Sequence, residues 1–236
     1  GPRRWRARSV ESVVAEWRWL VQQCSAAEIG VLDDSFNIDR QRVVSLCARL
    51  VDEGLTGVPW IMINGIRANL ADEEVLGAMV RAGCLRSAFG VESGNQQILD
   101  TVVDKHLTLD QVRSAFRAAK AVGLETIGFF IIGLPGETIA DFNETVRMNR
   151  LCQPDHHYTS IFYPYPGTDL YHLCESQHLL PADHLASGME RVKADLDLPQ
   201  FRQEQIQKAY NLFDYYFFKY LCHNFMFTLR FFLINS

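Results

Sequence analysis

The sequence of 236 residues predicts an α/β protein whose parallel strands alternate with helices. The first observation is the apolar run 127–132, because a strand covered on both faces carries such a run. The run ends in Gly133-Leu134-Pro135-Gly136, turn residues that lead at once into a helical pattern. The second observation is that helical patterns separate all the strand patterns, which implies parallel strands joined by crossover helices.

Capping residues and apolar spacing mark the first helices. Ser9 is a good N-cap for a helix whose apolar residues recur at helical spacing up to Val21. Asp39 is the expected cap of a helix that starts at Arg40, and another helix follows Asp72. The strands are expected at 28–33, 59–66, 85–92, 125–132 and 156–163.

A well-marked helix is expected over about 109–122. Thr108 and Gln111 form a capping-box pattern at its start, and Gly123 ends it. The remaining helices are expected near 95–102, after Thr138 and after Thr168.

Composition narrows the class of protein. With 48% apolar residues the chain can bury a sizeable core. A net charge of −5 gives no indication of a nucleic-acid partner. Six cysteines without a pattern, and no signal peptide, predict a reducing compartment and hence a cytoplasmic protein. No apolar run is long enough to cross a bilayer.

Polar or turn residues follow four of the expected strands. The carboxyl ends of parallel strands meet at one edge, where α/β proteins bind their ligands. We therefore expect these residues to collect around one ligand: Asp33 and Asp34, Glu92 and Ser93, Gly133 and Pro135, and Tyr163, Tyr165 and Gly167.

Taken in order, three stretches resemble the radical SAM superfamily: Gly90-Val91-Glu92-Ser93-Gly94, the segment 131–138 and Tyr165-Pro166-Gly167-Thr168. Asp33-Asp34-Ser35-Phe36 is similar to the cobalamin-associated branch, which carries a B12-binding domain. Periodicity alone leaves a doubly wound open sheet possible, whereas the resemblance implies a partial TIM-type (β/α) barrel. It also implies an enzyme that binds S-adenosylmethionine for radical chemistry, such as cobalamin-dependent methyl transfer.

The resemblance implies a cluster that these residues do not provide. Members of the superfamily hold a [4Fe-4S] cluster with a CxxxCxxC loop after the first barrel strand. The cysteines here form no such run: Cys24, Cys47, Cys84, Cys152, Cys174 and Cys222. We interpret the chain as a fragment without that first strand and loop, inactive as given; a natural cluster-less protein is the alternative. Cobalamin would depend on an absent upstream domain.

The resemblance also implies roles in binding S-adenosylmethionine. Asp33 or Asp34 would accept from its ammonium group while the other caps the turn, and Glu92 and Ser93 would face the ligand. Lys105 would meet its carboxylate, although a solvated lysine is an equal reading. Gly133 and Pro135 would shape the wall near the ribose, and Tyr163, Tyr165 and Gly167 would border the adenine. No catalytic residue and no metal ligand is assigned, and His156 and His157 are expected to be structural.

Three segments are expected: the partial barrel over 1–180, a linker over 181–200 and an aromatic-rich helical segment over 201–236. The last segment is expected to pack on the body or on an absent partner segment, and contact with a membrane surface is the alternative. The partners would be a small-molecule or peptide substrate and an electron donor.

Two other functions stay open. One is a non-catalytic module that keeps an S-adenosylmethionine pocket or only the scaffold. The other is a barrel enzyme in which Asp33, Asp34 and Glu92 bind a metal or act as acids, and the Gly-Pro-Gly turn holds phosphate. No phosphate-loop pattern stands beside that turn, which weakens the second.

Overall fold

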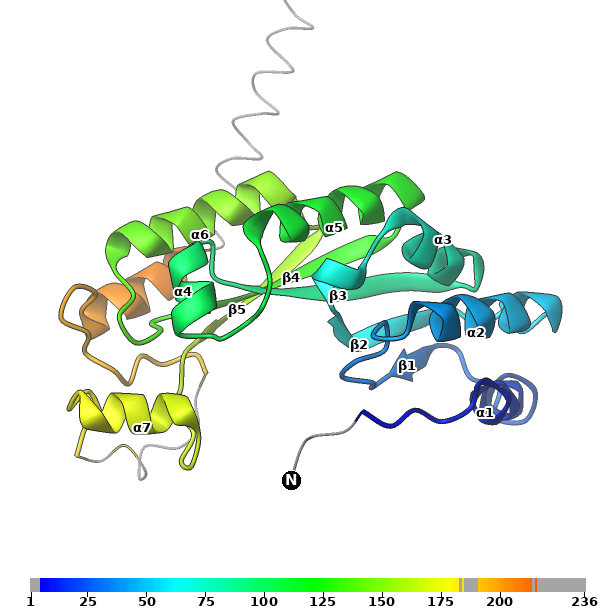
Figure 1. The fold of residues 1–236 in the computed structure, drawn as a ribbon, viewed down its shortest axis with the longest axis horizontal. Helices are drawn as coiled ribbons and strands as arrows, with labels where there is room; N and C mark the ends of the chain where they lie inside the picture. The colour runs from blue at the N-terminus through cyan, green and yellow to red at the C-terminus, as the bar shows by residue number, and fades with distance from the viewer. Residues whose placement is uncertain (1–4, 183, 185–190, 214, 216–236) are drawn as a thin grey trace, which may run out of the picture. The chain divides into compact units, whose positions relative to one another are not determined.

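The structure is a computed structural model that describes residues 5–182, 184, 191–213 and 215. It confirms an α/β fold with one five-stranded sheet in the order β1-β2-β3-β4-β5 (Figure 1). The strands are β1 (Ile29–Val31), β2 (Trp60–Ile66), β3 (Cys84–Glu92), β4 (Glu125–Ile132) and β5 (His156–Ile161). A doubly wound sheet reverses its strand order at a switch point. The sequential order excludes that alternative and is the order found in a (β/α) barrel.

Helices connect the strands in the expected alternation. They are α1 (Val10–Gln22), α2 (Arg40–Asp52), the 3₁₀ turn η1 (Ala68–Leu70), α3 (Glu73–Arg81), α4 (Gln96–Thr101), α5 (Leu109–Val122), α6 (Ile139–Cys152) and α7 (Asp169–Ser176). A further helix covers 203–213. The expected N-caps Ser9, Asp39 and Asp72 are confirmed, because each side chain accepts a backbone N–H in the first turn of its helix.

Two strands are shorter than expected. Strand β1 stops at Val31, and an Asp33 oxygen then accepts from the N–H of Ser35, which starts a turn. Strand β5 ends at Ile161, although the N–H of Phe162 still donates to the Ile132 carbonyl at 2.8 Å. Pro164 cannot continue that ladder because proline has no N–H.

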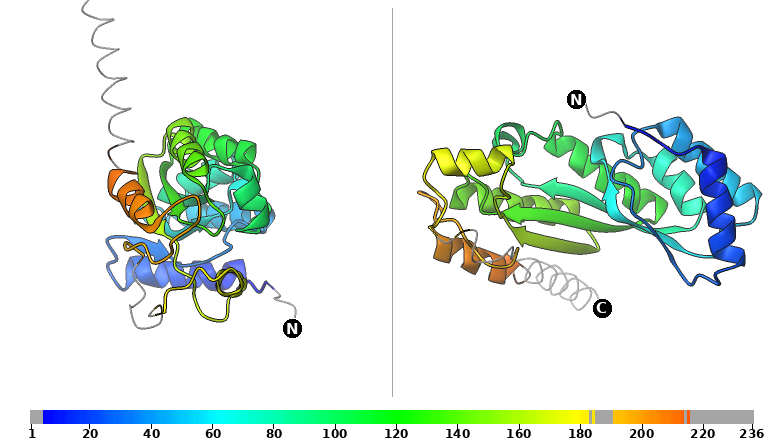
Figure 2. Two further views of the ribbon diagram at one scale, coloured as in Figure 1. Left: turned by 90° about the vertical axis from the view of Figure 1, so that its left-hand side faces the viewer. Right: turned by 90° about the horizontal axis from the view of Figure 1, so that it is seen from below.

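The chain forms two compact units. Unit 1 comprises 1–90, 110–127 and 154–156, and unit 2 comprises 91–109, 128–153 and 157–236. In unit 1 the buried Trp60 packs edge-on against Trp17, with ring centroids 5.5 Å apart, and its indole N–H donates to the Ala82 carbonyl at 2.9 Å. Helix α1 lies beside α2 (blue in Figures 1 and 2).

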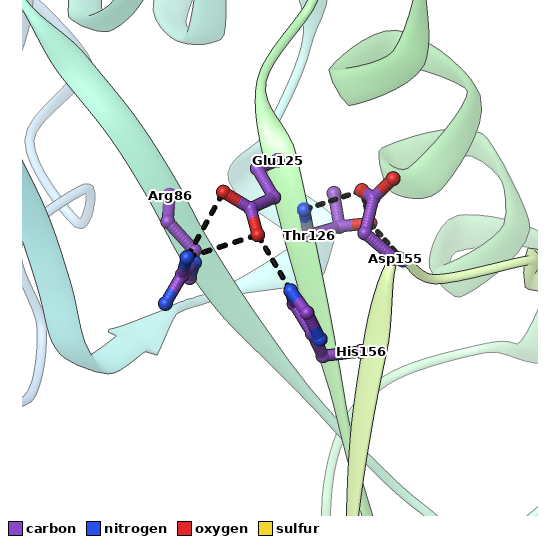
Figure 3. A network of polar contacts seen from close by, with 5 residues as sticks. All are labelled: Arg86, Glu125, Thr126, Asp155 and His156. Carbon is purple, nitrogen blue, oxygen red and sulfur yellow. Dashed lines mark hydrogen bonds and ion pairs between the residues drawn. The ribbon is translucent and has the colours of Figure 1, made fainter.

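A polar network joins the beginnings of β3, β4 and β5 within unit 1 (Figure 3). Glu125 accepts from Arg86 at 3.1 Å and contacts His156 at 2.6 Å. Burial opposes ionisation of Glu125, but these two partners outweigh it and lower the pKa of its carboxyl group. Asp155 accepts from the N–H and the hydroxyl of Thr126. His156 therefore contacts Glu125 at the starts of the strands, and its structural role stays a prediction.

In unit 2 an aromatic cluster joins β4, α6 and the helix over 203–213 (orange in Figures 1 and 2). Phe213 lies between Phe130 and Phe142, at centroid distances of 5.5 and 6.2 Å. Three of the residues at 191–200, which we expected as a linker, are buried: Ala194, Leu196 and Leu198. The helical face that we predicted beyond residue 200 includes the buried Ile206 and Phe213, whereas Phe217 and Leu221 lie outside the described residues. No helix among the residues described is long and apolar enough to cross a membrane.

Candidate functional site

The end of β3 carries a strained acidic residue. Glu92 has a φ of 62°, in the left-handed region. This conformation raises the energy of a non-glycine residue by about 1–2 kcal/mol, so the surrounding structure must impose it. Strained residues of this kind cluster at binding sites, which makes Glu92 a candidate for function.

Lys105 pairs with this carboxylate. Its ammonium nitrogen lies 2.7 Å from Oε1 of Glu92, and the two side chains are 33% and 19% exposed. The pair is partly desolvated but still reachable from solvent. An acid and a base side by side can exchange partners with a zwitterionic amino acid, since the carboxylate can accept from its ammonium group and the lysine can donate to its carboxylate.

The loop after Glu92 is held to α6. The fully buried Ser93 hydroxyl accepts from the N–H of Asn95 at 3.1 Å, and the N–H of Gly94 donates to Thr145 at 2.9 Å. The Asn95 amide donates to Asp141 and Glu144. Ser93, which we predicted to face the ligand, thus takes part in anchoring this loop.

The turn after β4 closes on a buried carboxylate. One oxygen of Glu137 accepts from the N–H groups of Gly133 and Leu134 at 2.6 and 3.1 Å, and its other oxygen has no partner among the described residues. Burial raises the pKa of Glu137 to about 8, although the two N–H donors oppose the shift. Gly133 has a φ of +81°, which favours glycine, and a Cβ there would lie 3.1 Å from Ile206.

Sequence reasoning named Gly133 and Pro135 but missed Glu137. The signal in the sequence was the position of Glu137 directly before Thr138, which forms a capping box with Asp141 at the start of α6. A carboxylate in this position can accept from the N–H groups of the turn that precedes it and so stabilise that turn.

A pocket of about 410 Å³ opens in unit 2. Glu92 and Arg191 are its charged residues, and the other lining residues are Phe129, Phe130, Ile131, Tyr158, Ser160, Ile161, Phe162, Tyr163 and Tyr165. Tyr163 and Tyr165 pack edge-on at 5.2 Å, and Arg191 donates to the Tyr165 hydroxyl at 3.0 Å. An aromatic lining with few charged groups suits a flat, polar ligand such as a purine nucleoside.

The sequence predicted only part of this lining. It pointed to Glu92, Tyr163 and Tyr165 but missed Phe129 and Tyr158, whose rings lie 6.1 Å apart. The signal that we missed is that side chains at alternate positions of a strand lie on the same face of the sheet, which applies to Phe129 on β4 and Tyr158 on β5. Gly167, which was also predicted as a site residue, has a φ of +81° and lies in the turn before α7.

The acidic pair after β1 belongs to unit 1. Asp33 caps its turn through the Ser35 N–H at 2.7 Å and borders a second pocket, of about 450 Å³. Asp34 accepts from the Asn64 side chain at 2.7 Å. One of the two carboxylates therefore caps the turn, as expected, and a ligand role for the pair stays a prediction.

Comparison with known proteins places the chain in a family. Residues 1–148 match the model of the radical SAM superfamily. The chain belongs to the radical SAM superfamily. An uncharacterised methyltransferase of Pyrococcus horikoshii is 33% identical over 206 residues, which are 87% of this chain and 44% of that protein. The anaerobic magnesium-protoporphyrin IX monomethyl ester cyclase of Rubrivivax gelatinosus is 31% identical over 169 residues, 72% of this chain and 30% of that protein.

Solved radical SAM structures share the fold. TsrM of Kitasatospora setae, a radical S-adenosylmethionine methyltransferase with cobalamin and a [4Fe-4S] cluster bound, gives a TM-score of 0.59 at 20% identity over 65% of this chain and 31% of that chain. HemN of Escherichia coli, coproporphyrinogen III oxidase, gives 0.57 at 14% identity over 88% and 46%. The chain spans less than half the length of the curated relatives named here.

The cysteines in the described part of the chain do not form a site for the radical SAM cluster. No group of three or more His, Cys, Asp or Glu residues in the described part of the chain could hold a metal ion. Cys47, Cys84 and Cys174 are buried, and burial raises the pKa of all three thiols, that of Cys47 to about 12. A cluster ligand must be a thiolate, and burial in an apolar environment disfavours that form.

This burial predicts inert thiols in the native protein. In a Cys24→Ser/Cys222→Ser variant, we expect no thiol to react with an aromatic disulfide reagent at about pH 8 until urea unfolds the chain. Cys24 is exposed, and Cys222 lies outside the described residues, so both are removed. Rapid reaction of the folded variant would show that a remaining thiol is accessible and reactive.

Proposed function

We propose that the chain is the S-adenosylmethionine-binding portion of a radical SAM catalytic barrel, and that it acts when joined to a part carrying the cluster ligands. The observation that carries this proposal is the Glu92–Lys105 pair at the carboxyl end of β3, with Glu92 in a strained conformation and on the wall of an aromatic pocket. Family membership supports the class of ligand, and the pair supports the position that we propose for its amino-acid end.

The residues of unit 2 fit the parts of S-adenosylmethionine. Glu92 and Lys105 offer a negative and a positive partner for its ammonium and carboxylate groups. The aromatic side chains of the pocket offer stacking surfaces for its adenine. Gly133 and Pro135 shape the neighbouring turn, and Asp33 and Asp34 remain further candidates. When bound, S-adenosylmethionine supplies a methyl group or a source of radical chemistry.

The proposed reaction is methyl transfer, with cobalamin bound by a further domain. Its support is that the Pyrococcus horikoshii relative is named a methyltransferase, and that TsrM was solved with cobalamin. We propose a small-molecule or peptide substrate, and an electron donor for the complete enzyme. The free thiols of the described cysteines fit a reducing compartment, so we propose the cytoplasm as its location.

Calorimetric titration with S-adenosylhomocysteine tests the ligand proposal. We expect Glu92→Gln and Lys105→Met each to weaken binding by about 10- to 100-fold, because each removes a charge-assisted contact. Glu204→Gln is the matched control, since Glu204 is an exposed glutamate of unit 2 that does not line the pocket.

Three outcomes distinguish the possible functions. Loss of affinity in the two site variants alone supports the proposal. If none of the variants changes the affinity, the ligand binds at another site. Absence of nucleoside binding, with or without binding of a divalent metal, would contradict the proposal and favour a scaffold module or a different barrel enzyme.

The isolated chain is expected not to cleave S-adenosylmethionine reductively. Cys47, Cys84, Cys152 and Cys174 are buried, Cys24 is exposed, and no three of the described cysteines converge, so a [4Fe-4S] cluster has no ligand set in the described part. The measurement is 5′-deoxyadenosine by chromatography after anaerobic reconstitution with iron and sulfide and reduction with dithionite. Production above a protein-free control would refute this expectation.

A further inference from the structure

His184 is a buried histidine with polar partners on both sides of its ring. It is 3% exposed. Its Nδ1 contacts the carboxylate of Asp195, and its Nε2 lies 2.9 Å from the carbonyl oxygen of Pro164. The ring stacks on Tyr163, with centroids 4.6 Å apart and an interplanar angle of 25°. The Tyr163 hydroxyl donates to the His184 carbonyl at 3.3 Å.

The chemistry of these partners fixes what the ring nitrogens do. A backbone carbonyl can only accept, so Nε2 must carry a proton and donate to Pro164. On the other side Nδ1 contacts the carboxylate of Asp195. Together the two contacts fix the orientation of the ring.

Hydrogen bonds to the helix over 203–213 hold the backbone next to Asp195. The N–H of the preceding Ala194 donates to Gln207 at 2.9 Å, and the carbonyl of Ala194 accepts from Gln203 at 2.8 Å. Both glutamines belong to the helix over 203–213. Nearer β5, the N–H of Ile161 donates to the Arg191 carbonyl at 2.7 Å. A continuous set of contacts therefore runs from that helix through Asp195 and His184 to Pro164.

Pro164, at the end of this set, adjoins the pocket wall in the sequence. Pro164 lies between Tyr163 and Tyr165, and both tyrosines line the pocket of unit 2. We propose that His184 is a positioning residue: with Asp195 it holds the Pro164 carbonyl and the ring of Tyr163, and so sets the wall against which the nucleoside of the ligand packs. The ligand part of this inference rests on the proposed function; the geometric part does not.

The test uses the whole chain labelled with fluorotyrosine. Tyr163→Phe and Tyr165→Phe variants assign two fluorine resonances, which report the pocket wall directly. We expect His184→Gln and Asp195→Ala to shift or broaden both resonances and to weaken S-adenosylhomocysteine binding by about tenfold, since each removes one hydrogen bond to a buried group. Asp195→Asn should restore both readouts, because its amide can donate to Nδ1 while Nε2 still donates to Pro164.

His172→Gln is the matched control. His172 lies on α7, is 63% exposed and does not line the pocket, so its replacement should leave both readouts unchanged. Unaltered resonances in His184→Gln would overturn the proposal whatever the ligand result. Altered resonances with unaltered affinity would overturn its link to the ligand. If the native chain binds no nucleoside, the proposed function fails, while the resonances still decide whether His184 positions the wall.

Discussion

Replacing Gly94 by alanine is expected to lower the free energy of unfolding by about 3 kcal/mol or more. A Cβ on Gly94 would lie 2.3 Å from the Glu144 carbonyl oxygen and 2.5 Å from the Thr145 Cα. Both atoms belong to the backbone of α6, so no side-chain rotation can relieve the clash. The loop after Glu92 would have to leave α6 and give up the Gly94 hydrogen bond to Thr145. Urea denaturation followed by circular dichroism measures the loss.

Gly57→Ala is the control for this change. Nothing lies within 4 Å of a Cβ on Gly57, so its replacement should alter the free energy of unfolding by less than about 1 kcal/mol. Equal effects of the two substitutions would mean that the close approach of the Gly94 loop to α6 does not occur in solution.

Removing the carboxylate of Glu137 is expected to have an effect of similar size. Glu137→Ala leaves the buried N–H groups of Gly133 and Leu134 without their acceptor, and each such loss destabilises the native state by about 1–3 kcal/mol. Glu137→Gln keeps an oxygen that can accept from both groups, so it should retain more stability than the alanine variant. An alanine variant as stable as the glutamine variant would show that the turn closes without this side chain.

Glu137 should also make stability depend on pH. Its pKa is about 8 in the folded chain and near 4.5 in the unfolded chain, so the folded state holds the proton more tightly. Its contribution is therefore most favourable below about pH 4.5 and is lost as the pH rises toward about 8.

The measurement is the difference in unfolding free energy between the native chain and Glu137→Gln. We expect the native chain to lose stability relative to this variant between about pH 5 and about pH 9. Glu204→Gln, at an exposed site, is the matched control for this comparison. A flat profile at both sites would mean that Glu137 is ionised throughout and that its two N–H donors outweigh its burial.

Local signals were enough to predict most of the fold. Caps such as Ser9 and Asp72 are local hydrogen bonds, and the apolar run of β4 is typical of a strand covered on both faces. The hydrophobic periodicity of the sequence could not predict the order of the strands, because the same alternation of strands and helices fits open and closed sheets.

The candidate site was predicted where it follows a strand end and missed where it depends on packing. Glu92 ends β3 and Tyr165 lies in the segment between β5 and α7, so their place could be predicted from the sequence. The role of Glu137 depends on its burial, and that of His184 on burial and on a partner distant in the sequence. Arg191 lines the pocket from a segment that we expected as a linker. We expected a linker because the buried residues of that segment alternate with polar ones.

The sequential order of the strands has a consequence for how the fold forms and changes. Every strand pairs with the next one along the chain, so each pairing closes a loop of only one crossover. Growth of the sheet can proceed from either neighbour, without waiting for remote segments to meet. A unit of strand and helix could likewise be gained or lost at an edge strand, β1 or β5, and leave the internal pairings intact. Variation among relatives of this chain should therefore concentrate at the two edges of the sheet.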